Sequence, residues 1–146
     1  MSATTIGRPM EILLVEDSLV DARFTMASLK QSDIRHRLTL VRDGEEALAF
    51  LRCEGVFARA PRPDLILLDL LLPKLSGLDV LAAARGDEAL RDIPVVVLTA
   101  ASEVEYREQC ELLGVEGYIT KPVELEKFLR IVRELKDHWR SDLLIS

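Results

Sequence analysis

Hydrophobic and polar residues follow one another along this chain in two alternating patterns. Five short segments are nearly continuous in apolar residues or alternate residue by residue, as β-strands do. The segments between them carry apolar residues at helical spacing, and several end at a glycine. N-cap candidates are Ser18 or Asp17 for the first helix and Ser102 for the fourth. The predicted strands lie in "EILLV" (11–15), "HRLTLV" (36–41), "DLILLD" (64–69), "IPVVVLTA" (93–100) and "GYIT" (117–120), and the predicted helices in 18–30, 42–55, 76–86, 103–114 and 123–139.

Strands that alternate with helices in this way form a parallel sheet with helices on both faces. We therefore expect an α/β fold of the (βα)5 type, doubly wound and flavodoxin-like, with the strands in the spatial order 2-1-3-4-5. A chain of 146 residues is long enough to bury one hydrophobic core. We expect a single domain over 1–146, with its core at 11–139 and tails at 1–10 and 140–146.

The composition of the chain limits which partners and which cellular location we expect. The chain is 49% hydrophobic, and its net charge of −6 disfavours nucleic acid or an anionic membrane as the main partner. It has no N-terminal signal pattern and no apolar run of about 18 residues, so we expect a cytoplasmic protein without a membrane span. Cys53 and Cys110 lie far apart without metal-ligand spacing and are expected to stay reduced.

Polar residues stand at the carboxyl ends of four of the predicted strands. Glu16 and Asp17 follow the first strand, Asp69 ends the third, Thr99 ends the fourth and Lys121 follows the fifth. Ligands of open α/β sheets bind at this edge, where the first and third strands would be neighbours about 4.8 Å apart. We therefore expect the carboxylates to converge, with the hydroxyl and the ammonium beside them.

Carboxylates held this close repel one another, which raises a pKa or requires a cation. Oxygen ligands of this kind suit Mg²⁺, which takes one or two carboxylates and keeps sites for water and phosphate oxygens. Lys121 supplies a compact positive charge and Thr99 a hydroxyl donor for an oxyanion. Each residue alone is more often a cap or a turn former. Together they predict a phosphoryl-transfer site in which Asp69 is the nucleophile.

The segments "VED", "LILLDLLLP", "VVVLTA" and "YITKP" make the chain resemble the receiver domain of two-component response regulators over residues 11–139. The resemblance implies that Asp69 accepts a phosphoryl group from the phosphohistidine of a sensor kinase. It also implies that Glu16, Asp17, Asp69 and the backbone carbonyl of Leu71 bind Mg²⁺. Such a protein is a phosphoacceptor that assists its own phosphorylation, and not an enzyme.

The resemblance assigns further roles. Thr99 would be the switch hydroxyl, Lys121 would pair with the phosphoryl group, and Tyr118 would be the aromatic switch. Without the resemblance, Tyr118 would be a strand aromatic packed on the fourth helix. Gly77 matches the glycine of the loop after the acceptor and would otherwise be a turn residue. The Lys121–Pro122 bond is expected to be cis, which is found in only about 5% of X-Pro bonds.

Two departures from the family pattern affect what the resemblance implies. The acid pair is Glu-Asp where Asp-Asp is common, which would move one metal ligand outward or to a contact through water. Leu71 and Ala101 stand two residues after Asp69 and Thr99, where members that dephosphorylate fast carry polar residues. We therefore predict an aspartyl phosphate that hydrolyses slowly.

The remaining segments bear on partners. Only "RSDLLIS" follows the last predicted helix, which predicts a stand-alone regulator without an output domain. The segments "RPDLILLDLLLPK", "RCEGVFARAPRPD" and "DHW" are most similar to regulators paired with bacterial phytochrome kinases. The apolar residues of the last helix and tail either complete the core or support a homodimer through the fourth helix, fifth strand and fifth helix, with the tail reaching the partner. These residues are Phe128, Ile131, Val132, Leu135, Trp139, Leu143, Leu144 and Ile145.

Other functions on the same architecture have different requirements. An Asp-dependent phosphatase of the haloacid dehalogenase type needs a second acid two residues after the nucleophile, where this chain has Leu71. A flavin or dinucleotide binder needs a Gly-rich loop after the first strand, and "VEDSLVD" has no glycine. A degenerate receiver that only binds proteins stays open, and phosphorylation would then change nothing.

Overall fold

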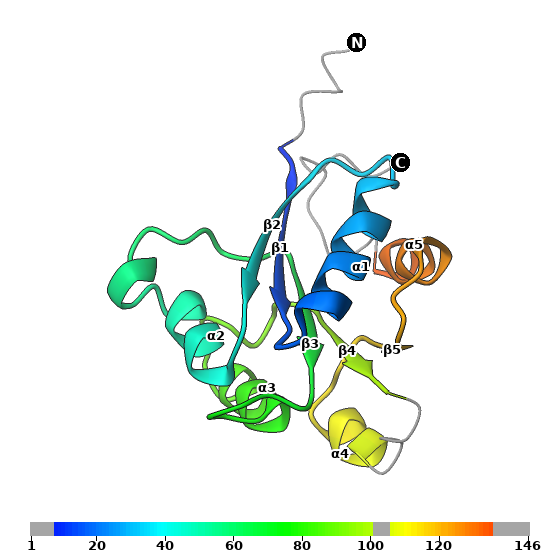
Figure 1. Cartoon of the computed structure of the whole chain (residues 1–146). Coiled ribbons are helices and arrows are strands. Elements are labelled where there is room, and N and C mark those ends of the chain that lie inside the picture. The colour runs from blue at the N-terminus through cyan, green and yellow to red at the C-terminus, as the bar shows by residue number, and fades with distance from the viewer. Residues whose placement is uncertain (1–7, 101–105, 136–146) are drawn as a thin grey trace.

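A computed structural model describes residues 8–100 and 106–135. Five parallel strands form one sheet in the order β2-β1-β3-β4-β5, which confirms the predicted topology (Figure 1). Their carboxyl ends therefore lie along one edge of the sheet. The strands are β1 (Met10–Val15), β2 (His36–Val41), β3 (Leu65–Asp69), β4 (Val95–Thr99) and β5 (Gly117–Thr120).

Helices cover both faces of the sheet, as the alternating pattern predicted. One hydrophobic core lies between the sheet and α1 and α5, and a second lies between the sheet and α2, α3 and α4 (Figure 1). The helices are α1 (Leu19–Lys30), α2 (Gly44–Leu51), α3 (Gly77–Arg85), α4 (Arg107–Leu112) and α5 (Leu125–Glu134), with a short 3-10 turn η2 at Gly55–Phe57. Among the described residues, no helix is long and apolar enough to cross a membrane.

The two cores explain why the central strands are continuously apolar. In β3, Leu65 and Leu67 pack in the core of α1 and α5, whereas Ile66 and Leu68 pack in the other core. Successive side chains of a strand point to opposite faces, so a strand covered on both sides has no solvent-facing position. The first polar side chain of β3 is Asp69, at the carboxyl edge.

Two helices differ in extent from the prediction. The structure ends α2 at Leu51, short of Gly55, because Cys53 adopts a left-handed backbone conformation with φ of 55°. The structure starts α4 at Arg107, and the predicted N-cap Ser102 lies outside the described residues.

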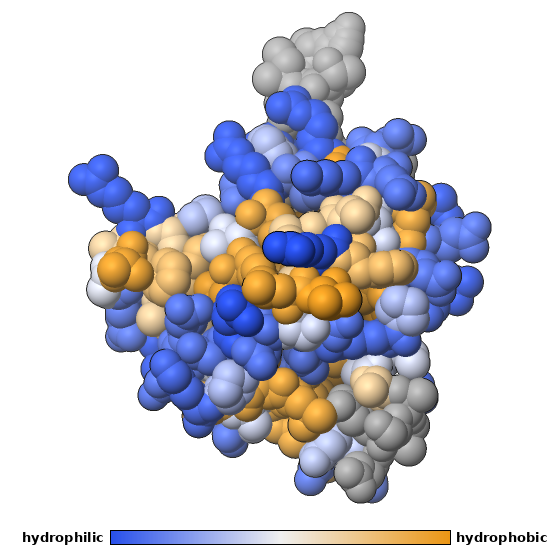
Figure 2. All heavy atoms as spheres, viewed as in Figure 1, coloured by the Kyte–Doolittle hydropathy of each residue, from blue (hydrophilic) through white to orange (hydrophobic). Residues whose placement is uncertain are grey.

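The helices α1 and α5 cover the same face of the sheet. Some of their apolar residues are buried in the core and others are exposed on the surface. In α5, the predicted stripe is core, since Phe128 and Val132 are at most 1% exposed. The tail residues of the proposed dimer contact lie outside the described residues. On α1, Leu19 and Phe24 are 42% and 47% exposed, and Val20 is 77% exposed. Figure 2, viewed from the side of α1 and β2, shows apolar surface between the charged groups.

Candidate functional site

Asp69 is a buried carboxylate at the carboxyl edge of the sheet. It ends β3 and is 5% exposed. Its Oδ1 accepts a hydrogen bond from the backbone N–H of Leu71 at 3.2 Å. Its Oδ2 accepts one from the Lys121 ammonium at 3.1 Å. The side chain is thus held by two donors at the place where the sequence predicted the site.

Lys121 lies among three carboxylates. Its Nζ is 2.8 Å from Glu16 Oε1 and 3.1 Å from an oxygen of both Asp21 and Asp69. An ammonium has three donors, and here each faces one carboxylate. The backbone places the lysine: its N–H donates to the Thr99 carbonyl at 2.8 Å. The bond to Pro122 is cis, which confirms the prediction drawn from the resemblance.

One of the three predicted carboxylates does not join this cluster. Glu16 is fully buried, but the side chain of Asp17 is 54% exposed and lies 3.9 Å from Arg42, which also donates to the Asp17 carbonyl at 2.8 Å. Asp17 lies in the bend that follows β1, and its side chain contacts Arg42 instead of Lys121. The predicted binding of a metal ion by Asp17 stays a prediction.

Asp21 is the third carboxylate beside Lys121, and it was not among the predicted site residues. It lies in the first turn of α1, where the N-cap Ser18 accepts a hydrogen bond from its backbone N–H at 3.2 Å. The available signal was an acid three residues after a capping serine, in a helix that starts directly beyond the Glu-Asp pair. That position brings its side chain back to the edge of the sheet.

The cluster changes the protonation of its members. Burial and, after it, the contact with Asp69 raise the pKa of Glu16 from 4.5 to about 7, although Lys121 opposes the shift. Burial by itself would lower the pKa of Lys121, but hydrogen bonding to Glu16 and the charges of Asp69 and Glu16 outweigh it and raise that pKa. The lysine therefore stays charged, and the site as a whole favours an added cation.

The donor set fits a divalent cation of the magnesium type. Glu16 Oε1 is buried and makes no hydrogen bond among the described residues, although it is 2.8 Å from Lys121. No three acidic, His or Cys side chains within the described part of the chain are arranged to hold a metal ion. Two carboxylates, Glu16 and Asp69, are nevertheless enough for Mg²⁺, which fills its other positions with carbonyl, water and phosphate oxygens.

Thr99 and Tyr118 are close to the same edge. Thr99 ends β4, is 3% exposed, and donates from Oγ1 to the Ala100 carbonyl at 3.0 Å. The hydroxyl of Tyr118 donates to Cys110 Sγ of α4 at 3.5 Å, and the Arg107 guanidinium lies 5.3 Å from the centre of its ring. This packing on α4 is the arrangement expected of Tyr118 without the resemblance. Ala101, the second position predicted to set the rate of dephosphorylation, lies outside the described residues.

The loop that follows Asp69 depends on a close backbone approach at Gly77. The Gly77 N–H donates to the Leu70 carbonyl at 2.9 Å, and a Cβ at Gly77 would lie 2.4 Å from the Asp69 carbonyl oxygen. The left-handed residue of this loop is Lys74, with φ of 68°. Gly77 is thus required for space and not, as expected of a turn glycine, for its backbone conformation.

Gly77→Ala is expected to destabilise the protein by about 2–3 kcal/mol, because the new methyl group forces the backbone of the acceptor strand to move. Gly86→Ala is the matched control: its Cβ would meet nothing closer than 3.4 Å, and its φ is −83°. That change should alter stability by less than about 0.5 kcal/mol. Urea unfolding measures both, and equal midpoints for the two variants would contradict the steric role of Gly77.

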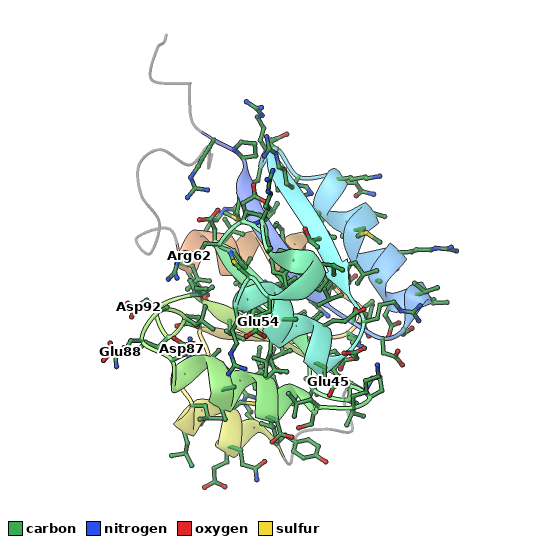
Figure 3. The ribbon with its side chains drawn as sticks, turned by 90° about the vertical axis from the view of Figure 1, so that its left-hand side faces the viewer. Glu45, Glu54, Arg62, Asp87, Glu88 and Asp92 are labelled. Carbon is green, nitrogen blue, oxygen red and sulfur yellow. The ribbon has the colours of Figure 1, made fainter. Side chains whose placement is uncertain are left out.

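Charged side chains on another part of the surface point outward, unlike the buried carboxylates at the sheet edge. Figure 3 shows side chains on α2 and on the connections before β3 and β4 that point outward from the ribbon. Arg62 joins the two connections by donating to the Ala89 carbonyl. The residues labelled there are Glu45, Glu54, Arg62, Asp87, Glu88 and Asp92.

Comparison with known proteins places this geometry in a family. The profile of the response regulator receiver domain matches residues 12–133. Response regulator Rcp1 of Synechocystis sp. is 43% identical over 131 residues, which cover 90% of this chain and 89% of Rcp1. A crystal structure of the Mn²⁺-bound form of Rcp1 matches with a TM-score of 0.76 and 40% identity, over 94% of this chain and 99% of that one.

Two further structures are similar over most of the chain. The bacteriophytochrome response regulator RtBRR has a TM-score of 0.82 and 39% identity, covering 95% of this chain and 84% of its own. The phosphorylated cyanobacterial phytochrome response regulator RcpA has a TM-score of 0.77 and 43% identity, covering 90% and 94%. On the profile match and on the identity to these relatives, the chain belongs to the response regulator receiver-domain family.

Proposed function

We propose that this protein accepts a phosphoryl group on Asp69 from the phosphohistidine of a sensor kinase and thereby changes its affinity for a partner. The observation that carries the proposal is the arrangement at the sheet edge: the buried carboxylate of Asp69, an ammonium 3.1 Å from it, and a second buried carboxylate, Glu16, 2.8 Å from the same ammonium. A nucleophile, a fixed positive charge and a cation-binding position are what phosphoryl transfer needs.

The chemical step makes few demands on the protein beyond alignment. A carboxylate oxygen of Asp69 forms a bond to phosphorus while the bond from phosphorus to the histidine nitrogen breaks. The histidine keeps the electron pair of that bond. Lys121 neutralises charge on the phosphoryl oxygens, and the Leu71 N–H, 3.2 Å from Oδ1, holds the carboxylate in its orientation.

A divalent ion, which we propose to be Mg²⁺, would neutralise the charge that builds up on the transferring phosphoryl group. Glu16, Asp69 and the backbone carbonyl of Leu71 would hold it, and Asp17 would join them through water or after turning away from Arg42. The Mn²⁺ in one structure of Rcp1 supports a divalent ion at this kind of site.

The response to phosphorylation would start at Thr99 and Tyr118. We propose that Thr99 turns toward the phosphoryl oxygens and that Tyr118 leaves Cys110 to follow it. The contacts of Tyr118 with Arg107 and Cys110 join it to α4, so its movement would change the surface of α4, β5 and α5. That surface is the proposed site of homodimer formation or of partner binding.

The sensor kinase is proposed to be of the phytochrome type, because RtBRR and RcpA are phytochrome-associated regulators similar in sequence and structure to this chain. Beside the acceptor, a groove lined in part by Val20, Phe24 and Pro122 offers apolar surface to a docking protein. We propose that the protein acts as a phosphoacceptor and not as an enzyme, since the group that it phosphorylates is its own carboxylate. We place it in the cytoplasm, where its free thiols at Cys53 and Cys110 stay reduced.

Labelled acetyl phosphate tests the proposed function. With Mg²⁺ the protein should take up label approaching one phosphoryl group per chain, and chelation of the metal should prevent the uptake. Hydroxylamine should remove the label, because it cleaves acyl phosphates and leaves phosphate esters intact. Absence of label with both acetyl phosphate and a phosphorylated phytochrome-type kinase, or label that resists hydroxylamine, would overturn the proposal.

The phosphorylated protein is expected to lose its label slowly, with a half-life of minutes or longer. The Leu71 side chain beside the acceptor is 57% exposed and has no polar atom that could orient an attacking water. Leu71→Asn combined with Ala101→Glu should shorten the half-life about tenfold, a change of about 1.4 kcal/mol in the barrier. Leu112→Asn makes the same chemical change on exposed α4 surface and should leave the half-life unchanged. A wild-type half-life of seconds with Mg²⁺ present would contradict the prediction.

A further inference from the structure

Asp21 differs in origin from the other two carboxylates at Lys121. Glu16 and Asp69 come from the ends of strands, whereas Asp21 belongs to the first turn of α1. Its Oδ2 is 3.1 Å from Lys121 Nζ, and its side chain is 44% exposed. The N-terminal end of a helix stabilises a negative charge at this position. Lys121 therefore contacts two kinds of carboxylate: those at strand ends, and one in the first turn of α1.

A divalent ion and Lys121 compete for the same oxygens. The ammonium is 2.8 Å from Glu16 Oε1 and 3.1 Å from Asp69 Oδ2, and these two carboxylates are the buried acidic ligands that we propose for the ion. Two cations cannot share them at that distance without strong repulsion. Binding of the ion therefore requires the ammonium to withdraw from at least one of them.

We propose that Asp21 is a positioning residue: it retains Lys121 when a divalent ion takes Glu16 and Asp69, and it thereby sets the affinity for the ion. The inference rests on the metal site of the proposed function. With Asp21 in place, the Lys121 ammonium keeps a carboxylate partner when it withdraws from Glu16 and Asp69. The free-energy cost of displacing the ammonium is therefore low. Without it, Lys121 depends on the oxygens that the ion needs, and the ion binds less tightly.

The alternative is that Asp21 makes an ordinary surface ion pair. Exposed pairs of that kind contribute little, and an effect of the Asp21 charge on the ion would then act through space alone. The two explanations differ in whether Lys121 is required. Lys121 is 18% exposed and Glu16 is 1% exposed, so the path from Asp21 to the metal ligands runs through a nearly buried ammonium.

Calorimetric titration of the unphosphorylated full-length protein with Mg²⁺ alone distinguishes these explanations. Asp21→Asn should weaken Mg²⁺ binding about tenfold in the wild-type background, the lower end of what residues behind the direct ligands contribute. In the Lys121→Met background, the same change should alter the dissociation constant less than about twofold, because the competitor is absent. Asp21→Glu keeps the charge and should restore most of the affinity.

Three results would overturn the inference. An unchanged dissociation constant in Asp21→Asn would exclude any role for this carboxylate in metal binding. The same fold-change in both backgrounds would show a through-space charge effect that does not involve Lys121. If the wild-type protein bound no Mg²⁺, the metal site of the proposed function would fail and this inference with it, whereas the first two results leave that site intact. Thermal unfolding establishes that each variant is folded at the titration temperature.

Discussion

Asp69→Asn is expected to abolish labelling by acetyl phosphate and by kinase, with a fall of at least about a thousandfold in the initial rate. Asparagine has nearly the same shape, and its one side-chain oxygen can still accept from either the Leu71 N–H or Lys121, which lie 3.2 Å and 3.1 Å from the two carboxylate oxygens. Its amide oxygen is too weak a nucleophile to attack phosphorus. The loss would therefore report on the chemistry of the residue and not on a collapse of the site.

The same substitution should stabilise the metal-free protein, by about 1 kcal/mol near pH 7. The Asp69 charge raises the pKa of Glu16, so removing it relieves repulsion at a fully buried carboxylate. The pair with Lys121 is lost as well, but Glu16 and Asp21 remain as partners of the ammonium. If the site concentrates negative charge in order to hold a cation, Asp69→Asn should be both more stable and inactive.

Asp92→Asn is the control for both measurements, since Asp92 is an exposed acid on the connection before β4 (Figure 3). It should keep its label and melt at the wild-type temperature. Labelling of Asp69→Asn at more than a few per cent of the wild-type rate would place the acceptor elsewhere. A lower melting temperature for Asp69→Asn without metal would show that the Asp69–Lys121 pair outweighs the repulsion.

The fold could be predicted because its determinants are local or general. The apolar runs of β3 and β4 predict strands covered on both faces, and Ser18 caps α1 as its position suggested. Parallel strands bring their carboxyl ends to one edge of the sheet. The contact between Asp69 and Lys121 could therefore be predicted from the sequence.

The details that were not predicted depend on how the chain turns after each strand. Whether Asp17 or Asp21 faces Lys121 is decided by the turn between β1 and α1 and by the contacts of Arg42, which no local pattern reports. The function of Gly77 depends on how close the backbone of β3 lies, a tertiary distance. The contact of Tyr118 with Cys110 likewise needs the packed position of α4.

Lys121→Met is expected to make the stability of the protein dependent on metal and on pH. The substitution keeps most of the side-chain stem and removes the ammonium from Glu16, Asp21 and Asp69. Removing one partner of a fully buried charge pair costs about 3–5 kcal/mol, and the partial exposure of Asp21 reduces the expected loss to about 2–3 kcal/mol at pH 8 without metal. Mg²⁺ should recover most of it, because the ion can replace the missing positive charge.

The dependence on pH follows from the protonation of Glu16. Its pKa is about 7 in the folded wild type and 4.5 ordinarily, so the folded state binds more protons between these values and stability falls as pH rises through them. Lys121 lowers this pKa, so the variant should have a higher one, and its stability should keep falling above pH 7. At pH 5.5 Glu16 is protonated in both proteins, and the difference between them should be small.

Chemical unfolding at several pH values, with and without Mg²⁺, measures these effects. Lys30→Met is the matched control, because Lys30 is exposed in the last turn of α1 and its loss should change stability by less than about 1 kcal/mol at every pH. If Lys121→Met were equally destabilised at pH 5.5 and pH 8, lost packing of the lysine stem would explain the effect. If it were as stable as the wild type at pH 8 without Mg²⁺, the carboxylates would not need the ammonium, and the competition between Lys121 and the metal ion would have no basis.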